Sequence, residues 1–76
     1  MPPKLPRISG EKAISVLRHL GFVVIRQRGS HVVLKRRTFQ EEITCVVPLH
    51  DELTIGTLRG VLRQARVTPE EFMNNM

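Results

Sequence analysis

The feature that most constrains this chain is a polar, glycine-containing segment between two short apolar runs. The apolar runs cover residues 22–25 and 32–34, and the segment between them reads Arg-Gln-Arg-Gly-Ser-His. Two strand-forming runs separated in this way predict a β-hairpin, in which Gly29 supplies a backbone conformation that a side chain would resist. His31 then lies where the chain leaves the turn and enters the second strand.

The remaining elements follow from caps and apolar spacing. In chain order we expect a helix from Ser9 to Gly21, strands over residues 22–27, 31–36 and 43–47, a helix capped by Thr54, and a short helix opened by Thr68-Pro69-Glu70-Glu71. No helix separates the strands, which favours an antiparallel meander. Two amphipathic helices on one face of that sheet make a two-layer α+β sandwich, with the short C-terminal helix added. This is the layout of the double-stranded-RNA-binding fold.

Length and charge narrow the functional classes. The 76 residues predict a single domain over 1–76, with residues 1–7 as an extended lead-in. Residues 1–40 hold nine Lys or Arg and one acid, which gives +8, and residues 41–76 hold three Arg and six acids, which gives −3, for the net +5 of the chain. The basic half is a candidate surface for a polyanion, most simply nucleic acid.

Several classes of site are not indicated. Cys45 is the sole cysteine and lies in an apolar run, so we expect a buried thiol, no internal disulfide and a reducing compartment. The spacing of His19, His31 and His50 matches no zinc pattern, and there is no glycine-rich phosphate loop, so we expect no metal and no cofactor. No stretch predicts a membrane span or a secretory signal, which makes the cytoplasm the expected location.

The residues around the hairpin contain what RNA cleavage requires in the absence of a metal. Attack by the 2′-hydroxyl of RNA needs a group that moves a proton and cations that stabilise the phosphorane. His31 is the candidate general acid or base, because the pKa of imidazole lies near 6.5. Arg26, Arg28 and Lys35 are the candidate phosphate ligands. Strand alternation pairs Arg26 with Arg28 and His31 with Lys35, but the register decides whether the two pairs share a face.

Other residues are secondary candidates. Ser30 shapes the turn or offers its hydroxyl to a phosphate, and Gly29 allows the turn itself. Arg36 and Arg37 are expected to bind backbone phosphate, and His50 is either a second proton-transfer group or the source of a loop-ordering hydrogen bond. From the pattern alone, a basic hairpin whose histidine makes only a local hydrogen bond remains open. Two other classes also remain: a non-catalytic RNA-binding module and a protein-interaction subunit.

The order of short motifs resembles the HicA family of mRNA interferase toxins from type II toxin–antitoxin systems. The matching pieces are Gly21-Phe22, Arg26-Gln27-Arg28-Gly29-Ser30-His31, Val47-Pro48-Leu49-His50, Gly56-Thr57-Leu58-Arg59 and Thr68-Pro69-Glu70-Glu71-Phe72. The resemblance implies a double-stranded-RNA-binding-like fold and metal-independent cleavage of mRNA. It also implies that His31 is catalytic and that a HicB-type antitoxin inhibits by covering the site.

Two positions depart from the family pattern. Arg66 stands where the family more often has glycine, which predicts a differently shaped end to the preceding helix. Ile55 stands where lysine is commoner, which removes one positive charge. Neither position lies in the Gly-Ser-His motif.

Overall fold

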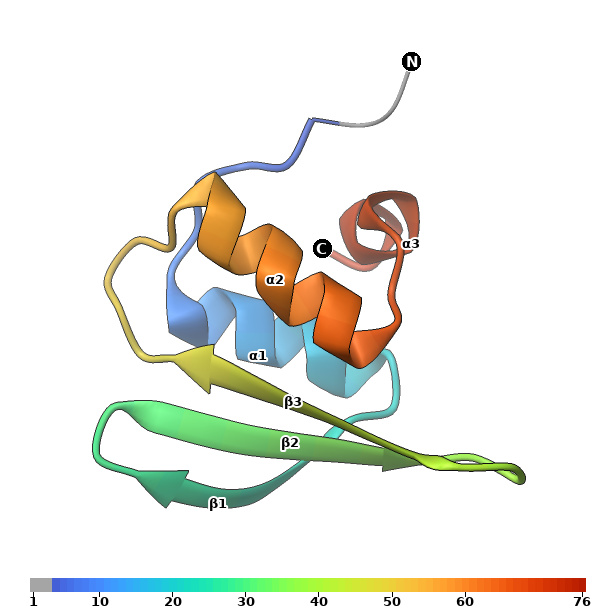
Figure 1. Ribbon diagram of the computed structural model, residues 1–76. Helices are drawn as coiled ribbons and strands as arrows, with labels where there is room; N and C mark the ends of the chain where they lie inside the picture. The colour runs from blue at the N-terminus through green and yellow to red at the C-terminus, as the bar shows by residue number, and fades with distance from the viewer. Residues whose placement is uncertain (1–3) are drawn as a thin grey trace.

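The computed structural model describes residues 4–76, so the start of the expected lead-in, residues 1–3, lies outside the described residues. The elements are α1 (Gly10–His19), β1 (Val23–Arg28), β2 (His31–Arg37), β3 (Glu42–Pro48), α2 (Ile55–Ala65) and α3 (Pro69–Asn74). The strands form one antiparallel sheet in the order β1-β2-β3, with the helices on one side of it (Figure 1). The predicted two-layer α+β sandwich is confirmed.

The helices begin where the sequence predicts, because each start is capped. The side-chain oxygens of Ser9, Thr54 and Thr68 each accept a hydrogen bond from a backbone N–H in the first turn of α1, α2 and α3 respectively. Thr68 and Glu71 complete a reciprocal capping box. After α1 the chain turns through Gly21, whose φ of +98° favours glycine.

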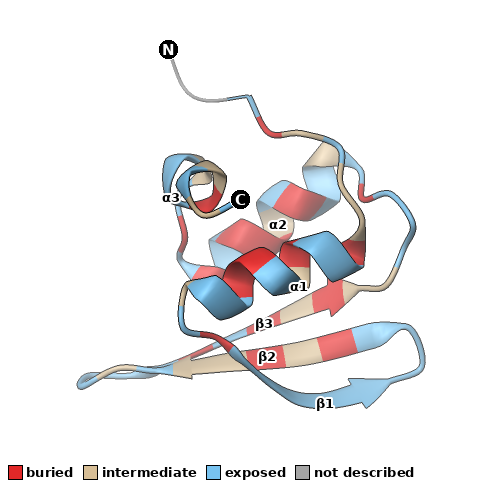
Figure 2. Ribbon diagram, turned by 180° about the vertical axis from the view of Figure 1, so that it is seen from behind, coloured by how far each residue is buried: buried red, intermediate tan, exposed pale blue. Residues whose placement is uncertain are grey.

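The core lies between the helices and the side of β2 and β3 that faces them (Figure 2). Alternate residues of these strands are buried, as expected when helices cover one face of a sheet. Cys45 is one of them, and its burial raises the pKa of the thiol to about 11. The largest fully buried side chains are those of Phe22, Phe72, Leu17, Leu34, Leu53 and Leu58.

Strand β1 lies outside this core. All its residues are exposed, including the apolar Val23, Val24 and Ile25, which are 59%, 46% and 48% exposed. The β1–β2 register shifts between Val24 and Arg26, so Ile25 forms a bulge. Apolar residues on both sides of the strand do not indicate which face is buried, and the structure buries neither.

The end of α2 keeps the backbone conformation that glycine favours, although the residue there is arginine. Arg66 has a φ of 56°, in the left-handed region, and its guanidinium pairs with the Glu41 carboxylate. The departure from glycine at this position therefore leaves a left-handed helix end in place.

Candidate nucleic-acid interface

His31 follows a two-residue turn that fixes where β2 begins. Gly29 and Ser30 form the turn, and Gly29 has a φ of +59° while Ser30 has a negative φ, the pattern of a type II′ hairpin. A Cβ added at Gly29 would meet nothing within 4 Å, so the backbone angle, and not crowding, calls for glycine here. The predicted hairpin is confirmed, with His31 as the first residue of β2.

Contacts from neighbouring and from distant parts of the chain hold this turn in place. The Leu49 N–H donates to the Ser30 carbonyl at 2.6 Å, and the Gln27 side-chain amide donates to the Gly29 carbonyl at 3.0 Å. In the segment that follows β3, the carbonyl of His50, the residue after Leu49, accepts a hydrogen bond from the Gly10 N–H at 2.9 Å. The turn, the end of β3 and the start of α1 are therefore linked through backbone groups.

The approach of α1 to this segment depends on a second glycine. A Cβ at Gly10 would lie 2.0 Å from the Pro48 carbonyl oxygen, which is a clash with backbone. Pro48 is in turn the β3 partner of His31. His31 thus sits on a strand that is paired on both sides, and its backbone position is set by the sheet.

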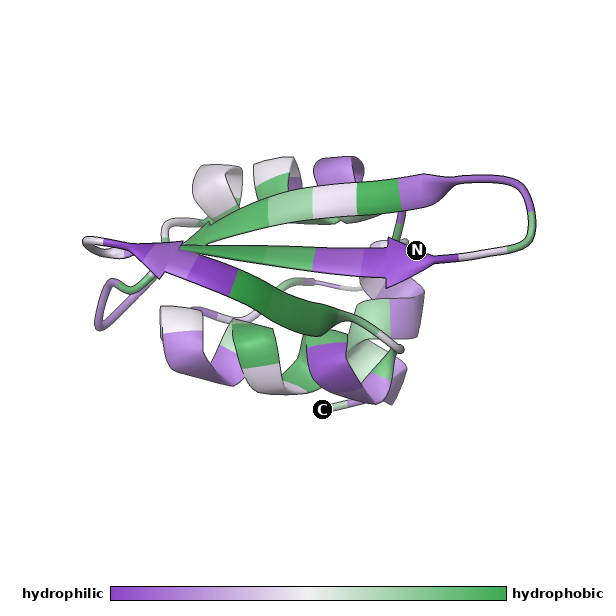
Figure 3. Ribbon diagram, turned by 90° about the horizontal axis from the view of Figure 1, so that it is seen from below, coloured by the Kyte–Doolittle hydropathy of each residue, from purple (hydrophilic) through white to green (hydrophobic). Residues whose placement is uncertain are grey.

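The strand register decides which side chains share a face. Paired residues of an antiparallel sheet point to the same side, and successive residues alternate. Arg28 pairs with His31 and Arg26 with Val33, while Lys35 lies four residues after His31 on the same strand. All five side chains therefore project from the face of the sheet opposite the helices. Figure 3 views the sheet from that side. We call the surface formed by Arg26, Arg28, His31, Val33 and Lys35 the open face.

The open face presents an accessible imidazole beside positive charge. His31, Arg26 and Arg28 are all exposed, and no acid occurs in the sequence between Glu11 and Glu41. Among residues 4–76, neither Arg26 nor Arg28 forms an ion pair with a carboxylate. These two guanidinium groups are available to an anion that approaches His31.

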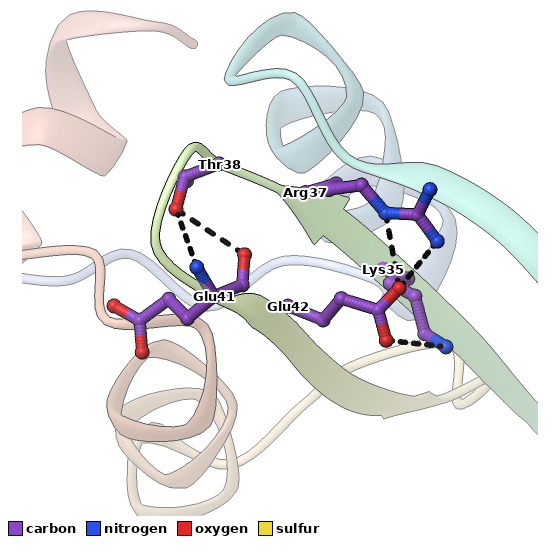
Figure 4. A network of polar contacts seen from close by, with 5 residues as sticks. All are labelled: Lys35, Arg37, Thr38, Glu41 and Glu42. Atoms are coloured by element: carbon purple, nitrogen blue, oxygen red, sulfur yellow. Dashed lines mark hydrogen bonds and ion pairs between the residues drawn. The ribbon is translucent and has the colours of Figure 1, made fainter.

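At the other end of β2, a carboxylate partly neutralises the cations. Glu42 accepts from Arg37 Nε at 3.0 Å and pairs with Lys35 Nζ at 3.4 Å (Figure 4). The hydrogen bond from Arg37, and then the charge of Lys35, lower the pKa of Glu42 below its usual range, so the carboxylate stays ionised. Lys35 therefore shares its charge with Glu42, whereas the two arginines of β1 do not.

Arg36 lies apart from the other predicted phosphate ligands. It pairs with buried Ile43 and so points to the helix side of the sheet. Its Nη1 donates to the Leu20 carbonyl at 3.1 Å, and its guanidinium carbon lies 5.9 Å from the centre of the Phe22 ring. These contacts tie the end of α1 to the sheet, which is a structural use of the side chain.

The remaining candidates lie at the hairpin end of the sheet. Ser30 is exposed in the turn, directly before His31, and its carbonyl is the acceptor for Leu49. His50 is exposed in the loop after β3, two residues beyond the partner of His31, and the loop-ordering hydrogen bond that it makes goes through its backbone carbonyl.

Sequence reasoning missed the residues that position the site. Gly10, Gln27 and Leu49 fix the turn, and Glu42 sets the charge of Lys35. Only Gln27 carries a local signal, as a side chain that can reach back to its own turn. Gly10 and Leu49 act across more than ten positions of sequence, and Glu42 reaches Lys35 across the β2–β3 pairing, so only the sheet register identifies them.

Residues 4–76 contain no group of three or more His, Cys, Asp or Glu side chains placed to hold a metal ion. A hollow along the outer side of α1 is lined by Glu11, Ile14, Ser15, Arg18 and His19, none of which belongs to the open face. In the same residues 4–76, no helix has both the length and the apolar character needed to cross a membrane.

Comparison with known families gives one match. Residues 10–67 match the family model described as the HicA toxin of bacterial toxin–antitoxin systems. The matched region runs from the first residue of α1 to just beyond α2, so it includes the whole sheet and the open face. A search of curated proteins found no match.

Proposed function

This chain belongs to the HicA family of bacterial toxin–antitoxin toxins, and on that premise we propose that it is a metal-independent endoribonuclease that cleaves mRNA with His31. The observation that carries the proposal is the pairing of Arg28 with His31 across the β1–β2 hairpin. It places a guanidinium beside an exposed imidazole on one rigid face. A polyanion lying on that face would meet both groups at once.

In the reaction that we propose, the substrate supplies the nucleophile. The ribose 2′-oxygen attacks the adjacent phosphorus while the bond from phosphorus to the 5′-oxygen breaks. His31 either takes the proton from the 2′-hydroxyl or gives a proton to the departing 5′-oxygen, and a second group or water performs the other transfer. The products of this step are a 2′,3′-cyclic phosphate and a 5′-hydroxyl. His50 is the candidate for the second group, because the loop that carries it is joined to the turn through Leu49.

The arginines of β1 would stabilise the charge that develops on the phosphate. Arg26 and Arg28 are exposed on the open face and unpaired with any carboxylate within residues 4–76. Planar guanidinium groups can hold two phosphate oxygens at once, and positioned donors stabilise charge that appears in the transition state. Lys35 would contribute less, because Glu42 shares its charge. Ser30 offers a hydroxyl donor directly before His31.

A flat site suits this substrate. A sheet surface can accept an extended or bent RNA strand without a deep pocket, whereas small substrates are usually enclosed. The hollow along α1 lies outside the open face, and the proposed reaction does not use it. With mRNA as substrate, the toxin would act in the cytoplasm, and we propose a HicB-type antitoxin as its inhibitor.

The test is cleavage of mRNA by purified protein in excess EDTA. We expect fragments that end in 2′,3′-cyclic phosphate, and no cleavage of a 2′-O-methyl RNA of the same sequence, which would still bind. Binding without cleavage of the unmodified RNA would indicate a non-catalytic RNA-binding module. Cleavage that EDTA abolishes would contradict the metal-independent mechanism.

A further inference from the structure

The two outer edges of the sheet, on β1 and on β3, differ in their backbone hydrogen bonds. On β3, the Val46 N–H donates to the side-chain oxygen of Gln64 at 2.9 Å, so α2 satisfies a backbone group at that edge. On β1, no backbone hydrogen bond within residues 4–76 lies outside its pairing with β2. The outer edge of β1 therefore offers unpaired N–H and C=O groups to another strand.

The apolar side chains of β1 also do not belong to the hydrophobic core of the protein. Val23, Val24 and Ile25 are exposed on both faces of the strand, and Figure 3 shows them as a continuous hydrophobic segment along the first half of β1. In the described residues, the other exposed large hydrophobic side chains are Phe39 and Met76, which stand singly. A run of exposed apolar residues on an open edge is typical of a protein-binding surface.

Charge decides what kind of partner fits this edge. Beyond the apolar residues, the strand continues with Arg26 and Arg28, and no acid lies nearby in the sequence. A second copy would bring the same basic strand and another net charge of +5 to the interface, which opposes association. A strand with carboxylates opposite the two arginines would be attracted instead.

We propose that a strand of the antitoxin adds to the outer edge of β1, apolar where it meets Val23–Ile25 and acidic where it meets Arg26 and Arg28. The inference rests on the proposed function, which makes the antitoxin the partner, and adds the surface that the antitoxin occupies. Main-chain hydrogen bonds to the free edge would supply affinity, and the two kinds of side-chain contact would supply specificity.

Docking at this edge gives a mechanism of inhibition. Strands in a sheet lie about 4.8 Å apart, so the added strand would run next to β1 and about two strand spacings from His31. Its carboxylates would occupy Arg26 and Arg28, which the proposed reaction uses for phosphate. The antitoxin would then block RNA binding by occupying these cations.

The experiment is amide hydrogen exchange on the His31→Ala protein, with and without a HicB-type antitoxin, and it needs no catalytic activity. We expect that partner to slow exchange within Val23–Arg28, while exchange in β3 and α2 changes little. A variant in which Val23, Val24 and Ile25 are all replaced by threonine keeps three β-branched residues. It should bind the partner about tenfold more weakly or worse, because the apolar contact is lost. Phe39→Thr is the matched control, since Phe39 is fully exposed in the loop between β2 and β3 and is not part of β1, and it should bind normally.

Unchanged exchange in β1 on binding, with protection elsewhere, would overturn the proposal. Protection of β1 that rises with protein concentration in the absence of partner would also overturn it, because the occupant would then be a second copy. Exchange of the unsubstituted strand decides the matter even if the threonine variant folds poorly. The outcome is independent of RNA cleavage: β1 can be protected by the partner in a protein that cleaves no RNA, and the reverse can also hold.

Discussion

Arg28 and His31 face each other across the β1–β2 hairpin, one on each side of the Gly29–Ser30 turn, and both side chains project from the open face. The pairing depends on a turn of only two residues, which fixes the register. A one-residue slip would send one of the two side chains to the opposite face. The function that we propose therefore depends on the turn as much as on the two side chains.

The first prediction concerns the role of Arg28. Arg28→Ala should lower kcat/KM for RNA cleavage by about tenfold or more, because a charge-assisted phosphate contact is lost next to the reacting group. It should also make RNA binding less dependent on salt, by about one counterion. The measurement is cleavage and binding at a series of salt concentrations. Arg59→Ala, an exposed arginine on α2 in the helix layer, is the control and should change little.

The second prediction concerns the turn. Gly29→Ala should reduce the free energy of unfolding by about 1–2 kcal/mol, because alanine must adopt a φ near +59° although no atom crowds the added methyl group. Gly60 is the contrasting position, since an added Cβ would only touch the end of Arg63 at 4.0 Å inside a helix. Gly60→Ala should raise stability by about 1 kcal/mol. Urea denaturation measures both, and equal effects at the two positions would refute the conformational argument.

The third prediction separates backbone strain from charge at the end of α2. Arg66→Gly relieves the left-handed conformation, and Arg66→Ala keeps it, while both remove the ion pair with Glu41. The glycine variant should therefore be more stable than the alanine variant by about 1 kcal/mol, as measured by thermal or urea unfolding. If the two variants were equally stable, the left-handed backbone at Arg66 would carry no cost.

The fourth prediction concerns acid stability. Arg37 and Lys35 lower the pKa of Glu42 in the folded protein, so this carboxylate favours folding at pH values above its ordinary pKa of 4.5. That contribution is lost as the pH falls through the lowered pKa. Glu42→Gln should thus be less stable than the unsubstituted protein at neutral pH, and the difference should close on acidification. Unfolding measured from pH 7 to pH 3 tests this, and a pH-independent difference would exclude the electrostatic cause.

Local signals in the sequence were sufficient for most of the fold. Ser9, Thr54 and Thr68 marked the helix starts, and Gly29 marked the hairpin, because capping and turn preferences act within a few residues. The burial of β1 was different. Its apolar residues did not indicate which face of the strand is buried. The helices cover β2 and β3 and leave β1 exposed, and composition does not reveal which strand lies at the uncovered edge.

The site could be predicted only in part for a related reason. The residue types around His31 indicated phosphate chemistry, but their common face depended on the bulge at Ile25 and on the pairing of Arg28. In the sequence, Arg36 looked like a phosphate ligand equivalent to the neighbouring basic residues. In the structure it faces the helix layer and donates a hydrogen bond to the Leu20 carbonyl. The pairing of strands decides which face of the sheet each side chain lies on, and this pairing could not be predicted from a single sequence.

The most direct test of the account is the single-turnover rate of RNA cleavage at saturating protein in excess EDTA, for the unsubstituted protein and for His31→Ala. Saturation removes differences in binding, so the ratio of rates reports the chemical step. We predict that His31→Ala is slower by about 100-fold or more, the usual contribution of a general acid or base, while its affinity for RNA is retained. Equal rates for the two proteins would contradict the assignment of catalysis to His31.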